Sequence, residues 1–550
     1  MADQPFDQLM AAAYAFDEPA LVYGAAFHDG TTYPTAQVRV PLRMVNRHGL
    51  VAGATGTGKT KTLQILTEQL SSAGVPVFLV DIKGDISGIG APAQVNDRIT
   101  SRVAQIGETD YQPMAYPVEF MTLDAAGSGV HLRASVSSFG PILLAKVLEL
   151  IETQQSVLAL VFKYADDQQL PLVDLADLRA TLNYLNGDAG QAAMAEYGGL
   201  ASATVGVMIR KIVELEGQGA GAFFGQPEFD IDDLVRLAPD GRGIVSILEV
   251  ADMQDRPRLF STFMMWLLAS VYHHLPEVGD PDKPKLVFFL DEAHLLFEDA
   301  NPSFLDQIEM VARLIRSKGV GVYFVTQSPE DVPAKVLAQL GNRVQHALRA
   351  FTPDDQKMID ATARTFPTSD QYQVAHELVS LGIGEALVTV LSTKGVPSPT
   401  VHCVMRPPRS LMAQLDPAVF DGVVRASSVA PRYAQPVDPQ SAREMLTARL
   451  AAAAAEAAAA QAASDAAAQA ARSAPPSVAF PDSYGGGSYR GRAPSQPRTR
   501  STSTRAPRQP RADPGFDLGD AAKMGTRIIT SSTTNTILRG IFGILGGKKR

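Results

Sequence analysis

Short apolar runs alternate with helical patterns between residues 46 and about 410. Many of these runs are bounded by glycine or by a polar residue, as buried parallel strands tend to be. The expected strands are Gly49–Ala52, Val75–Val80, Ile244–Leu248, Leu286–Leu290, Val320–Val325, Val344–Ala350 and Ala386–Leu391. This alternation predicts an α/β fold in which helices flank a mainly parallel sheet.

The second and third expected strands are separated by about 160 residues that have mostly helical patterns, including Pro141–Tyr164 and Leu175–Asn186. We therefore expect a large helical insertion at about 135–240, within a sheet domain that extends over 46–425. Residues 1–45 are short and mixed, and we treat them as a separate N-terminal segment.

The composition changes sharply after the sheet domain. Residues 451–471 contain 16 alanines, which predicts a solvated helical spacer over 426–472 because the apolar heptad of a coiled coil is missing. Residues 473–514 are rich in Pro, Ser, Gly and Arg, and we expect a disordered linker. The segment 515–550 regains Ile, Leu and Phe, which predicts an amphipathic element that orders on a protein partner or packs on its own domain.

Length and composition narrow the class of protein. A chain of 550 residues exceeds the size of a single core, so we expect two or more folded units. The longest strongly apolar run, Phe263–Tyr272, is too short for a bilayer span of roughly 20 residues, and the N-terminus lacks a signal-peptide pattern. The single cysteine, Cys403, can form neither an internal disulfide nor a zinc site alone. We expect a soluble cytoplasmic protein with no transmembrane span.

Charge is divided unevenly along the chain. The 49 basic and 58 acidic residues give a net charge of −9. Seven arginines and no acid lie between Tyr484 and Ala512, so the rest of the chain carries 42 − 58 = −16. Any grip on nucleic acid must therefore be local, in a pore or in the tail.

The strongest chemical signal is a phosphate-binding loop that matches the Walker A pattern at each fixed position. It reads Gly53, Ala54, Thr55, Gly56, Thr57, Gly58, Lys59, Thr60. An apolar strand precedes it, and a helical run from Lys59 to Ser72 follows. Glycines let backbone N–H groups turn toward phosphates, and a helix N-terminus adds positive potential. We expect Lys59 to reach the β- and γ-phosphates of ATP and Thr60 to ligate Mg²⁺.

A second signal is the apolar run Leu286–Leu290, which ends in Asp291 and Glu292 as a Walker B strand does. We expect Asp291 to hold Mg²⁺ through water and Glu292 to polarise the attacking water. Glu292 therefore favours hydrolysis over simple nucleotide binding. The alternative for an isolated run of this kind is a strand that ends in a solvated turn.

Four further positions have alternatives that the residues alone leave open. Gln327 ends an expected strand, as a γ-phosphate sensor would, or belongs to an ordinary turn. Asp81 steadies the magnesium shell, binds a neighbouring loop or caps a helix. Arg343 and Arg349 act across a subunit interface on the transferring phosphoryl group, or pair locally with Asp354 or Asp355. His294 lacks partners at metal-ligand spacing, so we expect a hydrogen-bonding residue at a helix start.

The chain resembles the bacterial YjgR family. The resemblance rests on the runs 46–60, 80–85, 284–297, 314–322 and 339–353, covers roughly residues 40–405 and returns at Arg539–Gly543. That family is grouped with the HerA/FtsK ATPases, which are RecA-like P-loop motors, commonly hexameric, that pump or unwind double-stranded DNA. The resemblance implies a sensor role for Thr326 and Gln327 and an arginine-finger position at Arg349, with Arg343 second. The first 45 residues are too few for the β-barrel of HerA proteins.

Two functions follow from these observations. The first is a Mg²⁺-dependent, ATP-hydrolysing ring of identical subunits that translocates on double-stranded DNA, gripped in a pore by Lys83, Arg313, Arg316 and Lys318. The second is an ATPase that switches or remodels a protein partner, with the C-terminal segment as its docking arm. The resemblance favours the first function, and the acidic body favours the second.

Overall fold

A computed structural model describes residues 5–124, 126–250, 257–297 and 302–473. The chain divides into two compact units, Met1–Thr447 and Ala448–Arg550. In the second unit the described residues belong to α17 (Ala442–Ser473), and residues 450–470 are exposed throughout. The described residues end at Ser473, the last residue of α17. The rest of the predicted linker (473–514) and the whole predicted amphipathic element (515–550) therefore lie outside them.

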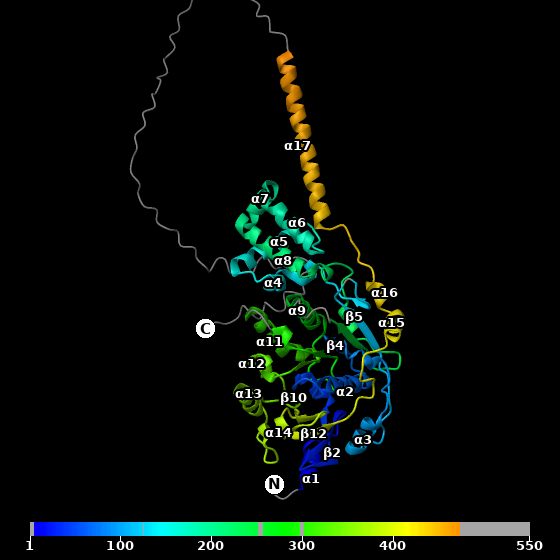
Figure 1. The fold of residues 1–550 in the computed structure, drawn as a ribbon. Coiled ribbons are helices and arrows are strands. Elements are labelled where there is room, and N and C mark those ends of the chain that lie inside the picture. Colours follow the sequence, from blue (N-terminus) through cyan, green and yellow to red (C-terminus); the bar gives the residue numbers. More distant parts are fainter. Residues whose placement is uncertain (1–4, 125, 251–256, 298–301, 474–550) are drawn as a thin grey trace, which may run out of the picture. The chain divides into compact units, whose positions relative to one another are not determined.

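The first unit is built on one sheet, which has twelve strands in the described part of the chain (Figure 1). Their order is β2-β1-β12-β11-β10-β3-β9-β8-β4-β7-β5-β6. The strands are β1 (Ala20–His28), β2 (Thr31–Pro41), β3 (Gly49–Ala52), β4 (Val77–Asp81), β5 (Val118–Thr122), β6 (Val130–His131), β7 (Val245–Glu249), β8 (Leu286–Leu290), β9 (Val320–Thr326), β10 (Asn342–Gln345), β11 (Glu385–Thr389) and β12 (Val401–Met405). Neighbours from β10 to β6 pair in parallel, and those from β2 to β10 pair antiparallel. The predicted α/β fold with a mainly parallel sheet is confirmed.

Most of the parallel strands lie close to their predicted positions, but β5 and β6 were missed in the stretch that was expected to be mostly helical. The antiparallel strands β1, β2 and β12 were also missed. β3 and β8 have the predicted bounds, and β4, β7, β9 and β11 differ by one or two residues at their ends. The expected strand at Val344–Ala350 was wrong beyond Gln345. There the backbone leaves the ladder, because Ala347 O accepts a hydrogen bond from Ala54 N and Leu348 N donates to Leu378 O.

Helices surround the sheet. Their bounds are α1 (Phe6–Ala13), α2 (Lys59–Ser72), α3 (Asp97–Ile106), α4 (Val136–Val147), α5 (Glu152–Asp167), α6 (Leu175–Asn186), α7 (Asp188–Met194), α8 (Ser202–Gly217), α9 (Pro257–His274), α10 (His294–Phe297), α11 (Pro302–Ile315), α12 (Ala334–Leu337), α13 (Pro353–Ala363), α14 (Val374–Ser380), α15 (Pro417–Ala426) and α16 (Ala430–Tyr433). Helices α4 to α8 lie between β6 and β7 in the chain and are grouped together in space (Figure 1). They occupy the range where the sequence predicts a helical insertion.

Both faces of the parallel sheet are buried. Side chains alternate along β4, so that Phe78 and Val80 pack with α9 and the helical insertion, while Val77 and Leu79 pack with α2. Covering both faces explains why the parallel strands read as continuous apolar runs. Residues before 46 belong to the same core, because Tyr14 and the strands β1 and β2 pack in the cluster that contains α2. The structure thus joins the predicted N-terminal segment to the sheet domain.

Among the described residues no single helix has the length and apolar composition that a membrane span requires. Residues Asp188–Tyr197 and Ser202–Gly217 pass that test only as a pair, and the pair is bent by 105°.

Candidate functional site

Residues 53–58 form the loop between β3 and α2, at the carboxyl edge of the parallel sheet, and Lys59 and Thr60 begin α2. Gly53, Gly56 and Gly58 have φ angles of +152°, +78° and +124°, in the region that favours glycine. Lys59 is buried at the first turn of α2, and its Nζ donates to the carbonyl oxygens of Gly53 at 2.7 Å and Ala54 at 3.3 Å. The loop therefore wraps the lysine amine at a helix N-terminus, where backbone amides and positive potential suit phosphate groups.

His346 supports this loop from beneath. Its Nε2 lies 2.8 Å from the Thr62 hydroxyl, and its Nδ1 lies 2.8 Å from Glu385 O. Because a carbonyl can only accept, Nδ1 carries the proton and Nε2 accepts from Thr62. Burial lowers the pKa of His346 to about 4, with the Lys59 charge acting in the same direction. A Cβ on Gly53 would stand 2.5 Å from His346 Cβ, so the glycine is needed for this close packing. No motif in the sequence assigns this role to His346.

Two carboxylates follow β8 at the same edge. Asp291 is buried, and its Oδ1 accepts from Glu292 N at 2.9 Å. Burial, and then the charge of Glu292, raise the pKa of Asp291 to about 7. Glu292 has a φ of +47°, which is uncommon for a residue with a side chain and is typical of strained positions at functional sites. His294 begins α10, as predicted for a helix-start residue, and its Nδ1 lies 3.3 Å from Glu292 Oε2.

The loop and the carboxylates meet at one place. Burial lowers the pKa of Lys59. After burial, the largest effects on this pKa come from the charges of Glu292, Lys83 and Asp291. Asp291 Oδ2 and Glu292 Oε2 are buried and make no hydrogen bond within the described residues. Buried carboxylate oxygens without a hydrogen bond, beside a glycine-rich loop, fit a divalent cation held against phosphate oxygens. Asp291 and the hydroxyl of Thr60, on the first turn of α2, could hold Mg²⁺, and residues 53–60 could hold the phosphates.

The strand β9 lies between β3 and β8 and brings Gln327 to this edge. Gly53 N donates to Thr326 O at 3.2 Å, which ties the end of β9 to the phosphate loop. The Thr326 hydroxyl in turn donates to Asp331 Oδ2 at 2.6 Å, and Gln327 itself is exposed. The topology therefore places Gln327 beside the loop, as a sensor requires. Asp331, whose charge also acts on Lys59, was not singled out from the sequence.

The two candidate arginines differ in their surroundings. Arg343 donates through Nη1 to Thr365 O at 2.8 Å and through Nη2 to Leu337 O at 3.4 Å, so its guanidinium binds backbone of its own chain. Arg349 is exposed and has no hydrogen bond or ion pair in the described part of the molecule. Neither arginine pairs with Asp354 or Asp355, which bind Lys357 and the backbone at 351–352. Of the two, only Arg349 has an exposed guanidinium without a partner among the described residues.

Of the roles considered for Asp81, the structure shows that its carboxylate binds the backbone of the loop after β4. Its Oδ1 accepts from Gly84 N at 2.7 Å and from Lys83 N at 3.2 Å, and its Oδ2 accepts from Ile86 N at 2.9 Å. Lys83, which the sequence suggested for a DNA pore, instead forms an ion pair with Glu292. Partial burial opposes the charge on Lys83, but the bond with Glu292 outweighs it and the pKa of Lys83 is raised.

The other predicted pore cations lie at the opposite edge of the sheet, near the amino ends of β3 and β9. Arg313 and Arg316 line a cavity of about 370 Å³ together with Arg47 and Lys394. Asp280 partly neutralises this cluster, since it lies 2.7 Å from Arg47 and 3.8 Å from Arg316. Lys318 stacks 5.1 Å above the ring of Tyr272. The structure thus separates these residues from Lys83.

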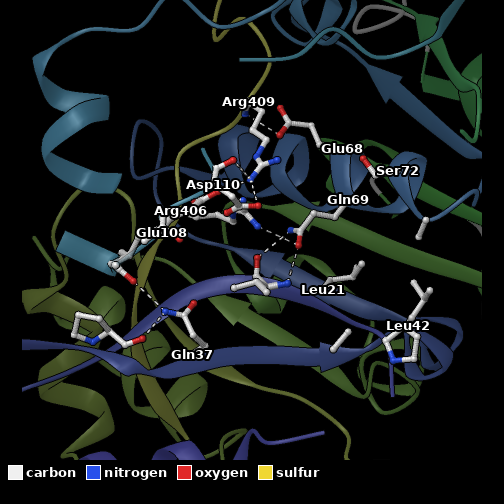
Figure 2. A pocket seen from close by; sticks show the side chains of 18 of the residues that line it. Leu21, Gln37, Leu42, Glu68, Gln69, Ser72, Glu108, Asp110, Arg406 and Arg409 are labelled. Atoms are coloured by element: carbon white, nitrogen blue, oxygen red, sulfur yellow. Dashed lines mark hydrogen bonds and ion pairs between the residues drawn. The ribbon is translucent and has the colours of Figure 1, made fainter. Parts of the chain in front are cut away.

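A cavity of about 590 Å³ lies away from the phosphate loop, between the β1–β2 hairpin, α2 and the segment after β12 (Figure 2). Its charged groups are paired with one another: Glu108 binds both Arg406 and Arg409, and Arg409 also binds Asp110 at 3.1 Å. None of residues 53–60, Asp291 or Glu292 lines it. This cavity is therefore separate from the phosphate loop and the two carboxylates.

Comparisons with known proteins show which family the chain is similar to. The chain is 22% identical over 356 residues to the DNA double-strand break repair helicase HerA of Saccharolobus solfataricus, with 64% of this chain and 63% of the relative covered. It is also 22% identical over 374 residues to HerA of Sulfolobus acidocaldarius, with 64% of each chain covered. The chain thus spans less than two thirds of the length of these relatives.

Among solved structures, the plasmid coupling protein TrwB in complex with ADP and Mg²⁺ has a TM-score of 0.47 and 17% identity, covering 74% of this chain and 98% of TrwB. VirB4 of Thermoanaerobacter pseudethanolicus has a TM-score of 0.43 and 14% identity, covering 74% of this chain and 99% of VirB4. The family model for the helicase HerA-like C-terminal region matches residues 28–550. This protein belongs to the helicase HerA-like C-terminal family.

Proposed function

We propose that this protein is a Mg²⁺-dependent ATPase that works as a homo-oligomeric motor on double-stranded DNA. The observation that carries the ATPase is the meeting of Lys59, Asp291 and Glu292 at one sheet edge, with two buried carboxylate oxygens that make no hydrogen bond among the described residues. A site for a structural ion pair alone would satisfy those oxygens within the protein.

Each residue at the edge has a chemical task in this proposal. Lys59 and the amides of residues 53–60 bind the phosphates, and Thr60 and Asp291 hold Mg²⁺, which neutralises charge that develops on the phosphoryl oxygens. Glu292 accepts a proton from the attacking water, and Gln327 orients that water. Arg349 stabilises the transferring group from a neighbouring subunit, because its exposed guanidinium lacks a partner within the described chain. Arg343 already donates to backbone carbonyl oxygens of its own chain, so it has a structural role in this proposal.

DNA as the polymer is supported by family membership and by the names of the HerA relatives. The cationic cluster of Arg47, Arg313, Arg316 and Lys394 offers a local surface for phosphates on an otherwise acidic chain.

The alternative is an ATPase that remodels a protein partner. It is favoured by the charge of −16 that remains once the seven tail arginines are set aside, 42 − 58. A protein substrate would leave ATP turnover insensitive to DNA.

The test is ATP turnover by the full-length protein with Mg²⁺, measured alone, with duplex DNA and with single-stranded DNA, over a range of salt concentrations. We expect Mg²⁺-dependent turnover that duplex DNA stimulates and that salt weakens, since phosphate contacts release counterions. Lys59→Ala is the control for contaminating ATPases. Turnover that duplex DNA does not change would favour the protein-remodelling function, and absence of turnover in all conditions would contradict both.

A further inference from the structure

Two loops that leave adjacent parallel strands bring an ammonium group onto the carboxylate of Glu292. β4 and β8 pair in register, with Val80 opposite Leu290, so the chain leaves both strands at the same edge. Lys83 and Glu292 each follow closely after these strand ends. We propose that Lys83 is a positioning residue for hydrolysis, which holds one oxygen of Glu292 so that the other faces the attacking water. This inference rests on the proposed ATPase function.

The two carboxylate oxygens of Glu292 have different surroundings. Lys83 Nζ donates to Glu292 Oε1. The second oxygen, Oε2, is buried, makes no hydrogen bond within the described residues and lies 3.3 Å from His294 Nδ1. The side chain of Glu292 is only 6% exposed, whereas that of Lys83 is 39% exposed. A carboxylate that is fixed through one oxygen keeps a single orientation, and the remaining lone pairs stay available to a water molecule.

The backbone that carries Lys83 is itself anchored. Asp81, the last residue of β4, is fully buried and accepts hydrogen bonds from the amides of Lys83, Gly84 and Ile86. Gly84 has a φ of +69°, in the left-handed region that favours glycine, so the turn has a specific backbone conformation. Lys83 therefore extends from a rigid turn rather than from a free loop, as a positioning group requires.

The other lysine at the site has a different set of contacts. Lys59 Nζ binds the carbonyl oxygens of Gly53 and Ala54 within the phosphate loop, not the carboxylate. The two ammonium groups thus serve two parts of the site, Lys59 the phosphates and Lys83 the carboxylate. In this arrangement the loss of Lys83 leaves phosphate binding in place and disturbs only the group that handles water.

Steady-state ATP turnover of Lys83→Ala and Lys83→Arg tests the assignment. We expect Lys83→Ala to lower kcat by roughly 10- to 100-fold while KM for ATP changes by less than about 3-fold, since a misplaced catalytic group costs about that much in rate. Lys83→Arg, which keeps a cationic donor, should recover much of the loss. Lys163→Ala is the matched control: it removes a lysine from another lysine–carboxylate pair, with Asp167 in α5, and should leave both constants unchanged.

Three results would overturn the inference. Wild-type kcat in Lys83→Ala would show that Glu292 needs no such support. A raised KM with unchanged kcat would make Lys83 a substrate-binding group, and reduced affinity for duplex DNA with unchanged basal kcat would make it a DNA contact. An inactive wild type would remove the proposed function together with this inference, whereas an active wild type with an unaffected Lys83→Ala removes only the inference.

A double substitution keeps the inference testable if Lys83→Ala folds poorly. Lys83→Gln combined with Glu292→Gln should hydrolyse ATP no more slowly than Glu292→Gln alone, because both changes interrupt one unit. Additive losses would place Lys83 in a separate role and contradict the assignment.

Discussion

The histidine beneath the phosphate loop gives a prediction that joins stability and pH. His346 connects Thr62 of α2 with Glu385 at the start of β11 and contacts the position of Gly53. His346→Gln keeps a neutral polar side chain but changes its shape. Two buried hydrogen bonds are at risk, each worth about 1 kcal/mol, so we expect a loss of about 2 kcal/mol in the free energy of unfolding at pH 7.5.

The size of that loss depends on pH in a direction that follows from the lowered pKa. The folded chain binds a proton at His346 with a pKa of about 4, whereas the unfolded chain binds it at the ordinary value of 6.5. The unfolded state therefore takes up the proton first, and the wild type loses stability as pH falls from 6.5 toward 4. At pH 5 this loss amounts to about 2 kcal/mol by proton linkage, and it is absent from His346→Gln.

The assay is urea denaturation of wild type and His346→Gln between pH 7.5 and 5, followed by the fluorescence of the single tryptophan, Trp266, which is buried on α9. The stability difference between the two proteins should narrow by about 2 kcal/mol over this range. Exposed His376→Gln is the control and should show no such narrowing. A difference that stays constant with pH would refute the reasoning that a neutral, buried His346 supports the loop.

The remaining predictions concern the loop, the subunit interface and the tail. Gly53→Ala should abolish binding of a fluorescent ADP analogue in a folded protein, because the new Cβ would stand 2.5 Å from His346 Cβ. Unchanged affinity would mean that the loop can shift to accommodate the methyl group without losing the nucleotide site. Arg349→Ala should leave ATP affinity unchanged and lower turnover by about 10³-fold or more. Mixing this variant with Glu292→Gln should restore part of the turnover, through interfaces that keep both groups. No recovery in a sample shown to exchange subunits would place Arg349 in cis or in a structural role. Deleting residues 516–550 separates the two alternatives for that segment: a lower melting temperature would indicate self-docking, and an unchanged one with loss of a bound protein partner would indicate a docking arm. If neither changes, the amphipathic-element interpretation is wrong.

Features set by local pattern were predictable from the sequence. The phosphate loop, the flanking strand β3 and the strand β8 with its two acids occupy the predicted residues, because buried parallel strands read as apolar runs and glycine spacing marks the loop. The hairpin of β1 and β2 was missed because residues 1–45 were treated as too short and mixed for part of the sheet. Its place depends on pairing with β12, nearly 400 residues away in the chain.

Contacts that depend on the order of the strands were not predictable. The pairing of Lys83 with Glu292 follows from the adjacency of β4 and β8, which no local pattern specifies. His346 gained its role because β10 ends at Gln345 and the chain then crosses beneath the loop. The contacts of Arg343 with carbonyl oxygens likewise arise only once Leu337, before β10, and Thr365, after α13, are folded against it.

The most direct test of ATP hydrolysis at this sheet edge is the turnover of Glu292→Gln, measured beside its ATP affinity. The substitution keeps the size of the side chain and removes the carboxylate that receives the proton. We expect ATP to bind with near wild-type affinity and to be hydrolysed about 10²-fold or more slowly. Turnover close to that of the wild type would contradict the account, because the base would then lie elsewhere.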